Sequence, residues 1–414
     1  MRNIVSIYDD VLTELNRRKV QDYEKFGPYF AISFACHAFN LMNEDRRIFM
    51  SSGQLPNMRL HLLFMAPPGC GKSFFLKQFG NLTTGILKHT GHPLHMEGSM
   101  SEAGLIGTVR TEPDGTVTVV PGAAREHHKS VFIIDEFMAM MSAMKAGYNS
   151  QLEAQLLTAL DSGDVSKRLA NGPIEYHTSF SLWCGIQPVK ASLEGGLGRR
   201  FCFLLNVPTE ADMDRYADAI AESDNITVDN TTLENFRKKV TFWISSLNMI
   251  EQVTFDKEIY ELLRHVVKAY SYEYDVYKRI TLGYHLSKYG ASKHVHVTLD
   301  EDLIKIILQQ GDWRWKIMQG PRVQQIIEVI RYAGYTFPDT GEFGLTKSEL
   351  IRHGVSMQLS ANLVHEITLD AARLGYVKIK GNKICMEAGA MLDSPIMQRA
   401  IDKGIIKDKN GTTC

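Results

Sequence analysis

The sequence contains no long apolar run, which sets it apart from membrane proteins. None of its stretches approaches the roughly 20 consecutive apolar residues that a membrane-spanning helix needs. Asp9 and Asp10 lie near the start, where a secretory signal would need an apolar core. We therefore expect an intracellular, cytoplasmic protein that makes no contact with a membrane.

Cysteine is also scarce, with six residues in a chain of 414. They show neither a C-x-x-C pair nor the spacing of a metal-ligand set. Such isolated cysteines are typical of reduced thiols in a reducing compartment, so we expect no zinc site and no disulfide. The six are Cys36, Cys70, Cys184, Cys202, Cys385 and Cys414.

The sequence also has no large excess of charge of one sign, because it contains 46 Lys and Arg residues and 47 Asp and Glu residues. This balance excludes a uniformly basic nucleic-acid-binding protein, although a ring-shaped assembly could still concentrate basic residues in a central pore. The hydrophobic content of 44% is ordinary for a globular chain, and the length predicts two or three domains.

The first part of the chain is predicted to be helical and to lead into an α/β core. Residues 1–57 carry apolar residues at helical spacing over 7–15 and 29–42, and the Gly-Pro pair at 27–28 is expected to separate the two helices. Residues 58–208 alternate short apolar strands with helices. That alternation is typical of a parallel sheet with helices on its faces.

Two further domains are predicted after the core. Residues 209–318 show long helical periods and are expected to form an all-helical lid beside the sheet. The pattern of residues 319–390 predicts three helices followed by two short strands joined at Gly381 and Asn382, which is the arrangement of a winged helix. Residues 391–414 are expected to be a frayed tail.

A glycine-rich loop at residues 66–73 follows an apolar strand and opens a helix, which is the context that phosphate binding requires. Its glycines let backbone N–H groups converge on phosphate oxygens, Lys72 would neutralise phosphate charge, and the Ser73 hydroxyl would bind Mg²⁺. We expect the loop to bind ATP. The candidate residues are Pro68, Gly69, Cys70, Gly71, Lys72 and Ser73.

Two acidic residues follow the apolar strand at 131–134. Burial of that strand would project Asp135 and Glu136 from the sheet edge that faces the phosphate loop. Asp135 is expected to hold Mg²⁺ through water, and Glu136 to orient and deprotonate the attacking water. The alternative is that the pair forms only the acidic first turn of a helix.

Between these motifs lie Ala103-Gly104-Leu105, a hairpin turn at Pro113-Asp114-Gly115, and Gly122-Ala123. Their order and spacing resemble the minichromosome maintenance (MCM) helicases, which are AAA+ ATPases. The resemblance covers about residues 59–310 and implies an AAA+ core, a hexameric ring and ATP hydrolysis between neighbouring subunits.

A second hairpin, within residues 155–188, is similar to the family's hairpin with a basic tip. The resemblance implies that Lys167, Arg168 and also Arg110 contact single-stranded DNA in the pore of the ring. Mobile basic side chains on a hairpin offer sequence-independent phosphate contacts. The alternative is a solvated turn.

The resemblance also implies roles for residues after the second hairpin. Gln187 stands where the family has the Asn of sensor 1, although its side chain is one methylene longer. Arg200 aligns with the arginine finger, which acts on a neighbour's nucleotide, and Arg199 is the alternative. Arg279 is the sensor 2 candidate, with Lys278 as the alternative.

The predicted winged helix supplies a second set of DNA-binding candidates on its third helix and its wing. Winged helices also dock proteins, so duplex DNA is one of two partners that this module could bind. The candidates are Gln358, Ser360, Asn362 and His365 on the helix and Lys378, Lys380 and Lys383 on the wing.

The chain departs from the family at its start, where short helices stand in place of an OB-fold with a zinc-binding insertion. These helices could dock a replication protein. We expect an α/β protein with an AAA+ core, a helical lid and a winged helix, acting as a hexameric ATP-dependent DNA helicase in replication, nucleoid-associated when bound to DNA. The alternative is an ATP switch, namely a replication initiator, helicase loader or transcription regulator, that binds DNA through the winged helix without unwinding it.

Overall fold

The computed structural model describes residues 6–43, 49–50, 53–54, 57–67, 69–81, 83–88, 94–98, 100–144, 151–169, 172–187, 196–206, 210–223, 229–267, 273–318, 344–356, 360–362, 364–365, 368–369 and 377–386. The chain divides into two compact units. Met1–Ala191 and Gly195–Ile307 form the first unit, and Ser192–Glu194 and Leu308–Cys414 form the second. Within the described ranges, no helix combines the length and the apolar character that crossing a membrane requires.

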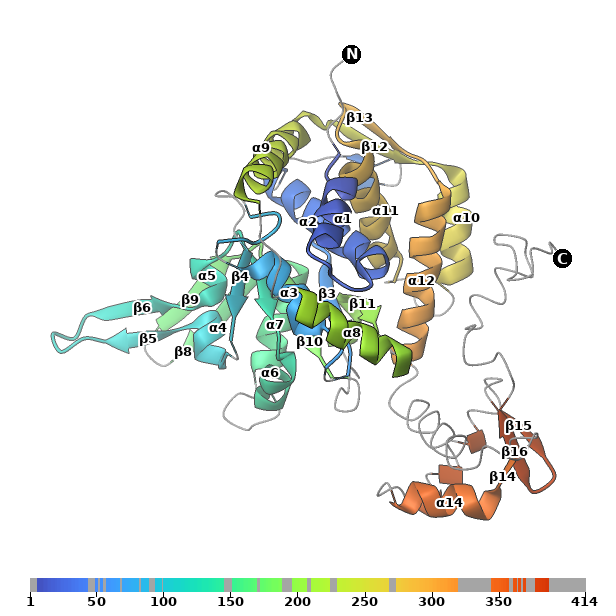
Figure 1. Cartoon of the computed structure of the whole chain (residues 1–414). Coiled ribbons are helices and arrows are strands. Elements are labelled where there is room, and N and C mark those ends of the chain that lie inside the picture. The colour runs from blue at the N-terminus through green and yellow to red at the C-terminus, as the bar shows by residue number, and fades with distance from the viewer. Residues whose placement is uncertain are drawn as a thin grey trace. The chain divides into compact units, whose positions relative to one another are not determined.

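A five-stranded parallel sheet forms the centre of the first unit (Figure 1). Four of its strands are almost continuous buried runs, because helices cover both faces of a parallel sheet. The order across the sheet is β11-β3-β10-β7-β4. The strands are β3 (His61–Met65), β4 (Leu94–Glu97), β7 (Val131–Ile134), β10 (Ser181–Ile186) and β11 (Phe201–Leu205).

The strand order brings three carboxyl ends together. Strand β10 lies between β3 and β7, with Ile186 beside Met65 and Cys184 beside Ile134. The loops that follow these three strands therefore meet at one edge of the sheet. Four of the five strands were predicted from the sequence, and the edge strand β4 was not.

Helices α1 (Tyr8–Arg17) and α2 (Tyr23–Met42) precede the sheet. The predicted break at Gly27 and Pro28 is wrong, because α2 runs through both residues. Leu12 and Leu15 of α1 approach Gly27 so closely that a Cβ there would lie 2.7 and 2.9 Å from their methyl groups. The glycine therefore serves helix packing, and the chain turns instead at residues 18–22.

Helix α2 is part of the core of the first unit. Its Phe30 stacks on Phe79 of α3 (Lys72–Gly80) with ring centroids 4.8 Å apart, and it meets Trp183 of β10 edge to face. The indole N–H of Trp183 donates to the hydroxyl of Ser33 at 2.7 Å. These contacts fix the helix of the phosphate loop between α2 and the sheet.

Both predicted hairpins are confirmed. Strands β5 (Gly107–Thr111) and β6 (Val117–Pro121) pair antiparallel and extend away from the central sheet (Figure 1). Strands β8 (Asp164–Leu169) and β9 (Gly172–His177) form the second hairpin. Short helices α4 (Glu102–Ile106) and α5 (Ala123–Glu126) flank the first hairpin, and α6 (Phe137–Met144) and α7 (Leu152–Asp161) lie between the hairpins in sequence.

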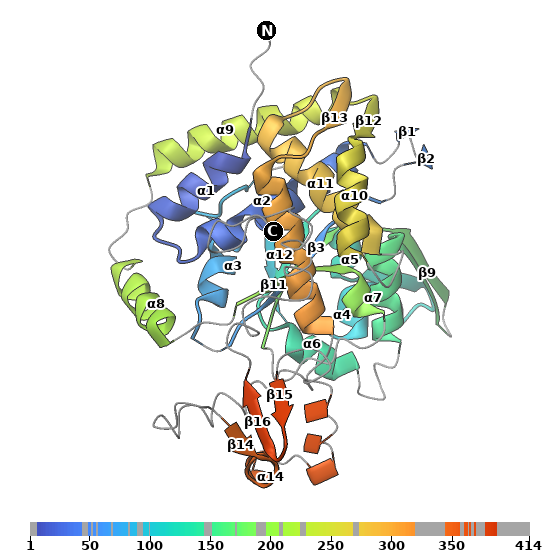
Figure 2. The same cartoon turned by 90° about the vertical axis from the view of Figure 1, so that its right-hand side faces the viewer.

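The segment after β11 is not purely helical, so the prediction of an all-helical lid is wrong. Two parallel strands, β12 (Gln252–Phe255) and β13 (His294–Val297), join β1 (Phe49–Met50) and β2 (Gly53–Gln54) in a small sheet (Figure 2). The helices after β11 are α8 (Glu210–Ser223), α9 (Asn230–Ser246), α10 (Lys257–Val266), α11 (Glu273–Tyr289) and α12 (Glu301–Met318), with a 3-10 turn at Leu247–Met249 (η4). Another 3-10 turn, Leu197–Arg199 (η3), precedes β11.

The second unit contains helix α14 (Lys347–Ser356) and a three-stranded antiparallel sheet in the order β14-β16-β15. The predicted hairpin is confirmed as β15 (Val377–Lys380) and β16 (Lys383–Met386), with Gly381 in the left-handed region at φ 61°. Strand β14 (Gly344–Thr346) was not predicted. The predicted helix over 323–334 lies outside the described residues, so the winged helix stays a prediction.

Candidate active site

The phosphate loop lies between β3 and α3, as the sequence predicts. Gly69 and Gly71 adopt positive φ angles of 80° and 69°, which side-chain-bearing residues rarely adopt. Lys72 and Ser73 form the first turn of α3, and no side chain caps that turn. Its backbone N–H groups are therefore available to an anion. Pro68 lies outside the described residues.

Lys72 and Asp135 converge from neighbouring loops over Gly185 of β10. A Cβ added at Gly185 would lie 3.1 Å from both Lys72 Cδ and Asp135 Oδ1, and 2.4 Å from the carbonyl oxygen of Asp135. Only glycine fits at this crossing. The sequence prediction that the phosphate loop and the acidic pair face each other agrees with this geometry.

The carboxylate of Asp135 fits a site for a hydrated cation. Its Oδ1 atom is buried and has no hydrogen-bond partner among the described residues. A buried carboxylate oxygen without a partner is costly unless a cation or a cation-bound water meets it. Ser73 stands in the first turn of α3, and Glu136 is exposed beside Asp135. This donor set of carboxylate and hydroxyl oxygens is the type that Mg²⁺ prefers.

Gln187 follows the last residue of β10 and is half-buried. Its strand lies between those that lead to Lys72 and to Asp135, and the N–H of Ala66 donates to the carbonyl of Ile186 at 3.1 Å. Gln187 therefore lies at the same sheet edge as the phosphate loop, where the sequence predicts it.

A small cavity beside the phosphate loop adds residues that the sequence did not indicate. Cys70 and Gly71 of the loop, Phe74 of α3 and Tyr216 of α8 line it, together with Asn206. The Tyr216 hydroxyl accepts from Asn206 Nδ2 at 2.7 Å and donates to the carboxylate of Asp22. Burial and the neighbouring Asp22 carboxylate raise the pKa of Tyr216. Asn206 and Tyr216 lie in segments separate from the phosphate loop, so no local sequence motif predicts them.

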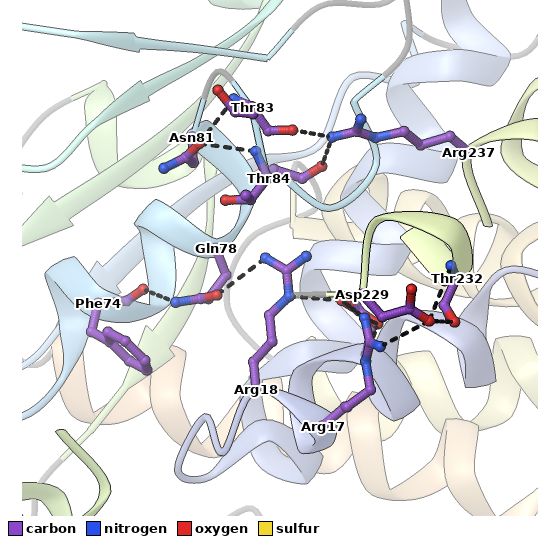
Figure 3. Close-up of polar contacts among 12 residues, drawn as sticks. Arg17, Arg18, Phe74, Gln78, Asn81, Thr83, Thr84, Asp229, Thr232 and Arg237 are labelled. Carbon is purple, nitrogen blue, oxygen red and sulfur yellow. Dashed lines mark hydrogen bonds and ion pairs between the residues drawn. The ribbon is translucent and has the colours of Figure 1, made fainter. Parts of the chain in front are cut away.

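A polar network joins the helix of the phosphate loop to α1 (Figure 3). Arg18 donates to Glu14 at 2.8 Å and to Gln78 of α3 at 3.3 Å, and Gln78 donates to the carbonyl of Phe74. Burial lowers the pKa of Arg18, while the hydrogen bond to Glu14 opposes this shift. These hydrogen bonds therefore hold the carboxyl end of α3 against α1.

Helix α9 holds the loop that follows α3. Arg237 donates to the carbonyl oxygens of Thr83 at 2.8 Å and Gly85 at 3.1 Å (Figure 3). Asp229 caps α9 by accepting from Thr231 N, and it also faces Arg17 of α1 at 3.9 Å. Helix α9 thus contacts the loop after α3 through that loop's backbone carbonyls.

Arg200 lies at the amino end of strand β11, whereas the phosphate loop follows the carboxyl end of β3. The two therefore stand at opposite ends of the parallel strands. Arg200 directly precedes β11, where Phe201 pairs with His61 and Leu205 pairs with Met65. Four strand steps at about 3.3 Å each place Arg200 roughly 13 Å or more from the carboxyl end of β3. The Arg200 guanidinium therefore belongs to a different face from Lys72 of the same chain.

Arg279 of α11 lies near the same end of the strands as Arg200. Burial lowers the pKa of Arg279, and the carboxylates of Asp275 and Asp161 partly oppose that shift. Asp161 is also the ion-pair partner of Arg200. The two arginines predicted to act on nucleotide therefore share a neighbourhood that is remote from the phosphate loop.

Lys167, for which DNA contact is predicted, makes an ion pair within the chain. Its ammonium lies 2.7 Å from Glu102 Oε1, and the side chain is only 14% exposed. Arg168 is exposed on the same strand, and Arg110 is exposed on β5 with its Nε 3.6 Å from Glu112. Of the hairpin cations expected to meet DNA, Arg168 and Arg110 face solvent, whereas Lys167 is committed to an internal ion pair.

The second unit holds the remaining predicted DNA-binding residues. Ser360, Asn362 and Lys383 are exposed, and His365 is half-buried. Lys378 and Lys380 lie on β15. Gln358 lies outside the described residues.

Residues 62–174 match the family model described as "ATPase family associated with various cellular activities (AAA)". The match spans the phosphate loop, the acidic pair and most of both hairpins. It ends before Gln187, Arg200 and Arg279. Among curated proteins, none matches the chain. Together with the parallel sheet and the phosphate loop at the carboxyl ends of its strands, the match supports an AAA ATPase domain within this chain.

Proposed function

We propose that this chain is an ATP-driven DNA translocase or helicase of the MCM-like kind, working in replication as a homo-hexameric ring. One observation carries the proposal: Lys72 and Arg200 lie at opposite ends of the parallel strands of one sheet. A head-to-tail ring brings opposite faces of neighbouring subunits together, so each interface would join one subunit's phosphate loop to the next subunit's arginine.

The residues at the carboxyl edge supply the chemistry within one subunit. The N–H groups of the loop and α3 hold the phosphates, and Lys72 neutralises their charge. Ser73 and Asp135 would hold Mg²⁺, which when bound adds further neutralisation of the phosphate oxygens. Glu136 accepts a proton from the attacking water, and Gln187 orients that water through its amide.

The neighbouring subunit completes the site. A guanidinium from Arg200 would stabilise the charge that spreads over the transferred phosphoryl group, an effect worth about 10³- to 10⁵-fold in rate where it has been measured. Arg279 shares the neighbourhood of Arg200, so we assign it to the neighbour's nucleotide as well. An isolated subunit should therefore bind ATP and hydrolyse it slowly.

The small cavity beside Gly71 is the proposed site of the purine base. It is contiguous with the phosphate loop and is lined mainly by apolar side chains, among them Phe74 and Tyr216. An aromatic ring beside the base contributes stacking that depends little on base identity. Tyr216 lies over Gly71, where an added Cβ would meet its ring at 3.4 Å, so a bound base would lie beside this ring.

DNA contact is proposed for the exposed cations of the two hairpins, Arg168 and Arg110. Such contacts would be sequence-independent and sensitive to salt. The commitment of Lys167 to Glu102 favours the alternative function, an ATP switch that does not unwind DNA, because it reduces the basic surface of the second hairpin.

Subunit mixing tests the shared active site. Glu136→Gln subunits keep a working arginine, and Arg200→Ala subunits keep a working pocket, so a mixture should hydrolyse ATP although each variant alone is nearly inactive. The matched control is Arg199→Ala, which should behave like wild type. Inactivity of Arg199→Ala alone, with recovery in its mixture and none in the Arg200 mixture, would transfer the role to Arg199.

Strand displacement separates the two functions. Forked DNA with 3′ or 5′ single-stranded tails should be unwound by the wild-type protein and not by Arg168→Ala. Retained ATP hydrolysis without displacement of either substrate would replace the translocase by the switch.

A further inference from the structure

Arg200 makes a side-on, bidentate ion pair with Asp161, the last residue of α7. Its Nε lies 2.9 Å from Asp161 Oδ1, and Nη2 contacts Oδ2. Nη1 donates to the carbonyl oxygen of Gly196 at 2.6 Å. A Cβ at Gly196 would lie 2.9 Å from Nη1, so the absence of a side chain there makes room for the guanidinium. The arginine is thus held at three of its donors.

Asp161 is in turn anchored to the core of the unit. The fully buried Arg59 donates from Nη2 to the carbonyl oxygens of Leu160 at 3.2 Å and Asp161 at 3.1 Å. Nε2 of His61 also lies 3.1 Å from the Leu160 oxygen, and Asn57 donates to the Asp161 oxygen at 2.8 Å. The end of α7 is therefore fixed by side chains that immediately precede or begin β3.

The pairing leaves part of the guanidinium available. An arginine has five N–H donors. Among the described residues, Asp161 takes two and Gly196 takes one, which leaves one N–H on each Nη atom. The carboxylate occupies the Nε side of the group, so the open donors lie at its outer end. The Arg200 side chain is 20% exposed, which agrees with a guanidinium that Asp161 holds on its Nε side and whose outer end reaches solvent.

We infer that Asp161 is the positioning residue for the Arg200 finger, holding its guanidinium in the orientation that a neighbour's γ-phosphate would meet. This inference rests on the proposed function, because it needs Arg200 to act across an interface. A fixed guanidinium loses less conformational freedom when it binds phosphate, and its direction is set before the subunits meet.

The competing possibility is that Asp161 restrains Arg200 and competes with phosphate for it. The two possibilities predict opposite changes in kcat when Asp161 is replaced. A positioning carboxylate makes hydrolysis faster, so its loss lowers kcat, whereas a restraining carboxylate makes hydrolysis slower, so its loss raises kcat.

The test uses the full-length Asp161→Asn variant, with Glu153→Gln on the same helix as the matched control. We expect kcat for ATP hydrolysis to fall about 10- to 100-fold in Asp161→Asn, the size typical for removing a partner that orients a functional group. KM for ATP and the binding of a fluorescent ATP analogue should stay at wild-type values, since the variant's own phosphate loop is intact. The Glu153→Gln control should keep its full rate.

Mixing distinguishes a positioning role from a folding defect. Asp161→Asn pockets should work when a Glu136→Gln neighbour supplies the finger, so random mixing should restore activity at about a quarter of the interfaces. Recovery with Arg200→Ala but not with Asp161→Asn would overturn the inference and leave the proposed function standing. Recovery with neither variant would overturn the shared active site itself. A rise in kcat for Asp161→Asn would show that the carboxylate restrains the finger.

Discussion

The Nζ atom of Lys167 lies 2.7 Å from Glu102 Oε1, with the two side chains only 14% and 11% exposed. This ion pair ties strand β8 of the second hairpin to helix α4 at the base of the first hairpin. The hydroxyl of Tyr176 on β9 adds a second link by donating to the carbonyl of Ile106 at 3.0 Å. The two hairpins therefore form one connected structure, and a displacement of one would be transmitted to the other.

Loss of the Lys167 side chain should destabilise this connection. In Lys167→Ala the Glu102 carboxylate would stay in a poorly hydrated place without its cation. We expect the free energy of unfolding to fall by about 1–3 kcal/mol, measured by urea denaturation. The matched control is Arg168→Ala, an exposed neighbour on the same strand, which should change stability by less than about 0.5 kcal/mol. Equal losses in the two variants would contradict an internal role for Lys167.

Asp135 should couple nucleotide binding to magnesium. At ATP concentrations about 100-fold above the dissociation constant, bound ligand stabilises a protein by roughly 2.7 kcal/mol, so the thermal midpoint of the wild-type protein should rise with Mg²⁺ and ATP. Asp135→Asn should lose most of the magnesium-dependent part of that rise, as should wild type in excess EDTA. Asp114→Asn, in the exposed turn of the first hairpin, is the control. A full magnesium-dependent shift in Asp135→Asn would place the cation elsewhere.

The same variant should behave differently without ligand. The buried Oδ1 of Asp135 has no partner among the described residues, so in the unliganded protein one oxygen of this carboxylate is shielded from water. Replacing that carboxylate by the neutral Asn amide should leave the unliganded protein as stable as wild type or more stable. A functional carboxylate that costs stability in the empty site is the expected signature of a cation site.

Gly185 should be indispensable for hydrolysis although it touches no substrate. A methyl group there would meet the Asp135 carbonyl at 2.4 Å and force apart Lys72 and Asp135. Displacements of about 1 Å at a catalytic group can cost 10²-fold in rate, so we expect Gly185→Ala to lower kcat by at least that factor. Gly98→Ala, where the added methyl group meets nothing within 4 Å, is the control. Comparable steady-state rates in both variants would contradict the predicted crowding.

The parts of the fold that the sequence predicted are those set by neighbours in the chain. The phosphate loop, the acidic pair after β7 and the turn at Gly115 follow from local residue types, and all three lie where expected. The failures have distant causes. Gly27 sits inside a helix because Leu12 and Leu15 pack on it, and β12 is a strand because β1, some 200 residues earlier, pairs with it. Such partners leave no trace in a local pattern.

The candidate site divides in the same way. Lys72 and Asp135 were identified from motifs, whereas Tyr216 and Asn206 were missed because each stands in an unremarkable segment. The basic character of Lys167 was read correctly, but its pairing with Glu102 depends on how two hairpins pack. Residue type predicts what a side chain can do, and tertiary contacts decide whether it is available.

Acid should destabilise the first unit through His61, the first residue of β3. Nδ1 of His61 accepts from the N–H of Leu182 at 3.1 Å, so its other nitrogen, Nε2, carries the proton and donates to the carbonyl of Leu160 at 3.1 Å. Burial and the nearby Arg59 charge hold the pKa of His61 well below its usual value of 6.5. The folded protein therefore keeps this imidazole neutral at a pH where the unfolded chain protonates it.

The direction of the effect follows from proton binding. Below pH 6.5 the unfolded state binds one proton more at His61 than the folded state does, so stability falls as the pH falls, by up to about 1.4 kcal/mol per pH unit from this residue. His61→Gln should be less stable than wild type at pH 7.5, because it disturbs two buried hydrogen bonds, yet it should lose less additional stability between pH 7.5 and 5.5. His294→Gln, an exposed histidine on β13, is the control and should keep the wild-type slope. If urea denaturation gave His61→Gln the same pH dependence as wild type, the imidazole would have to be protonated in the folded state, and the hydrogen bond from Leu182 could not exist.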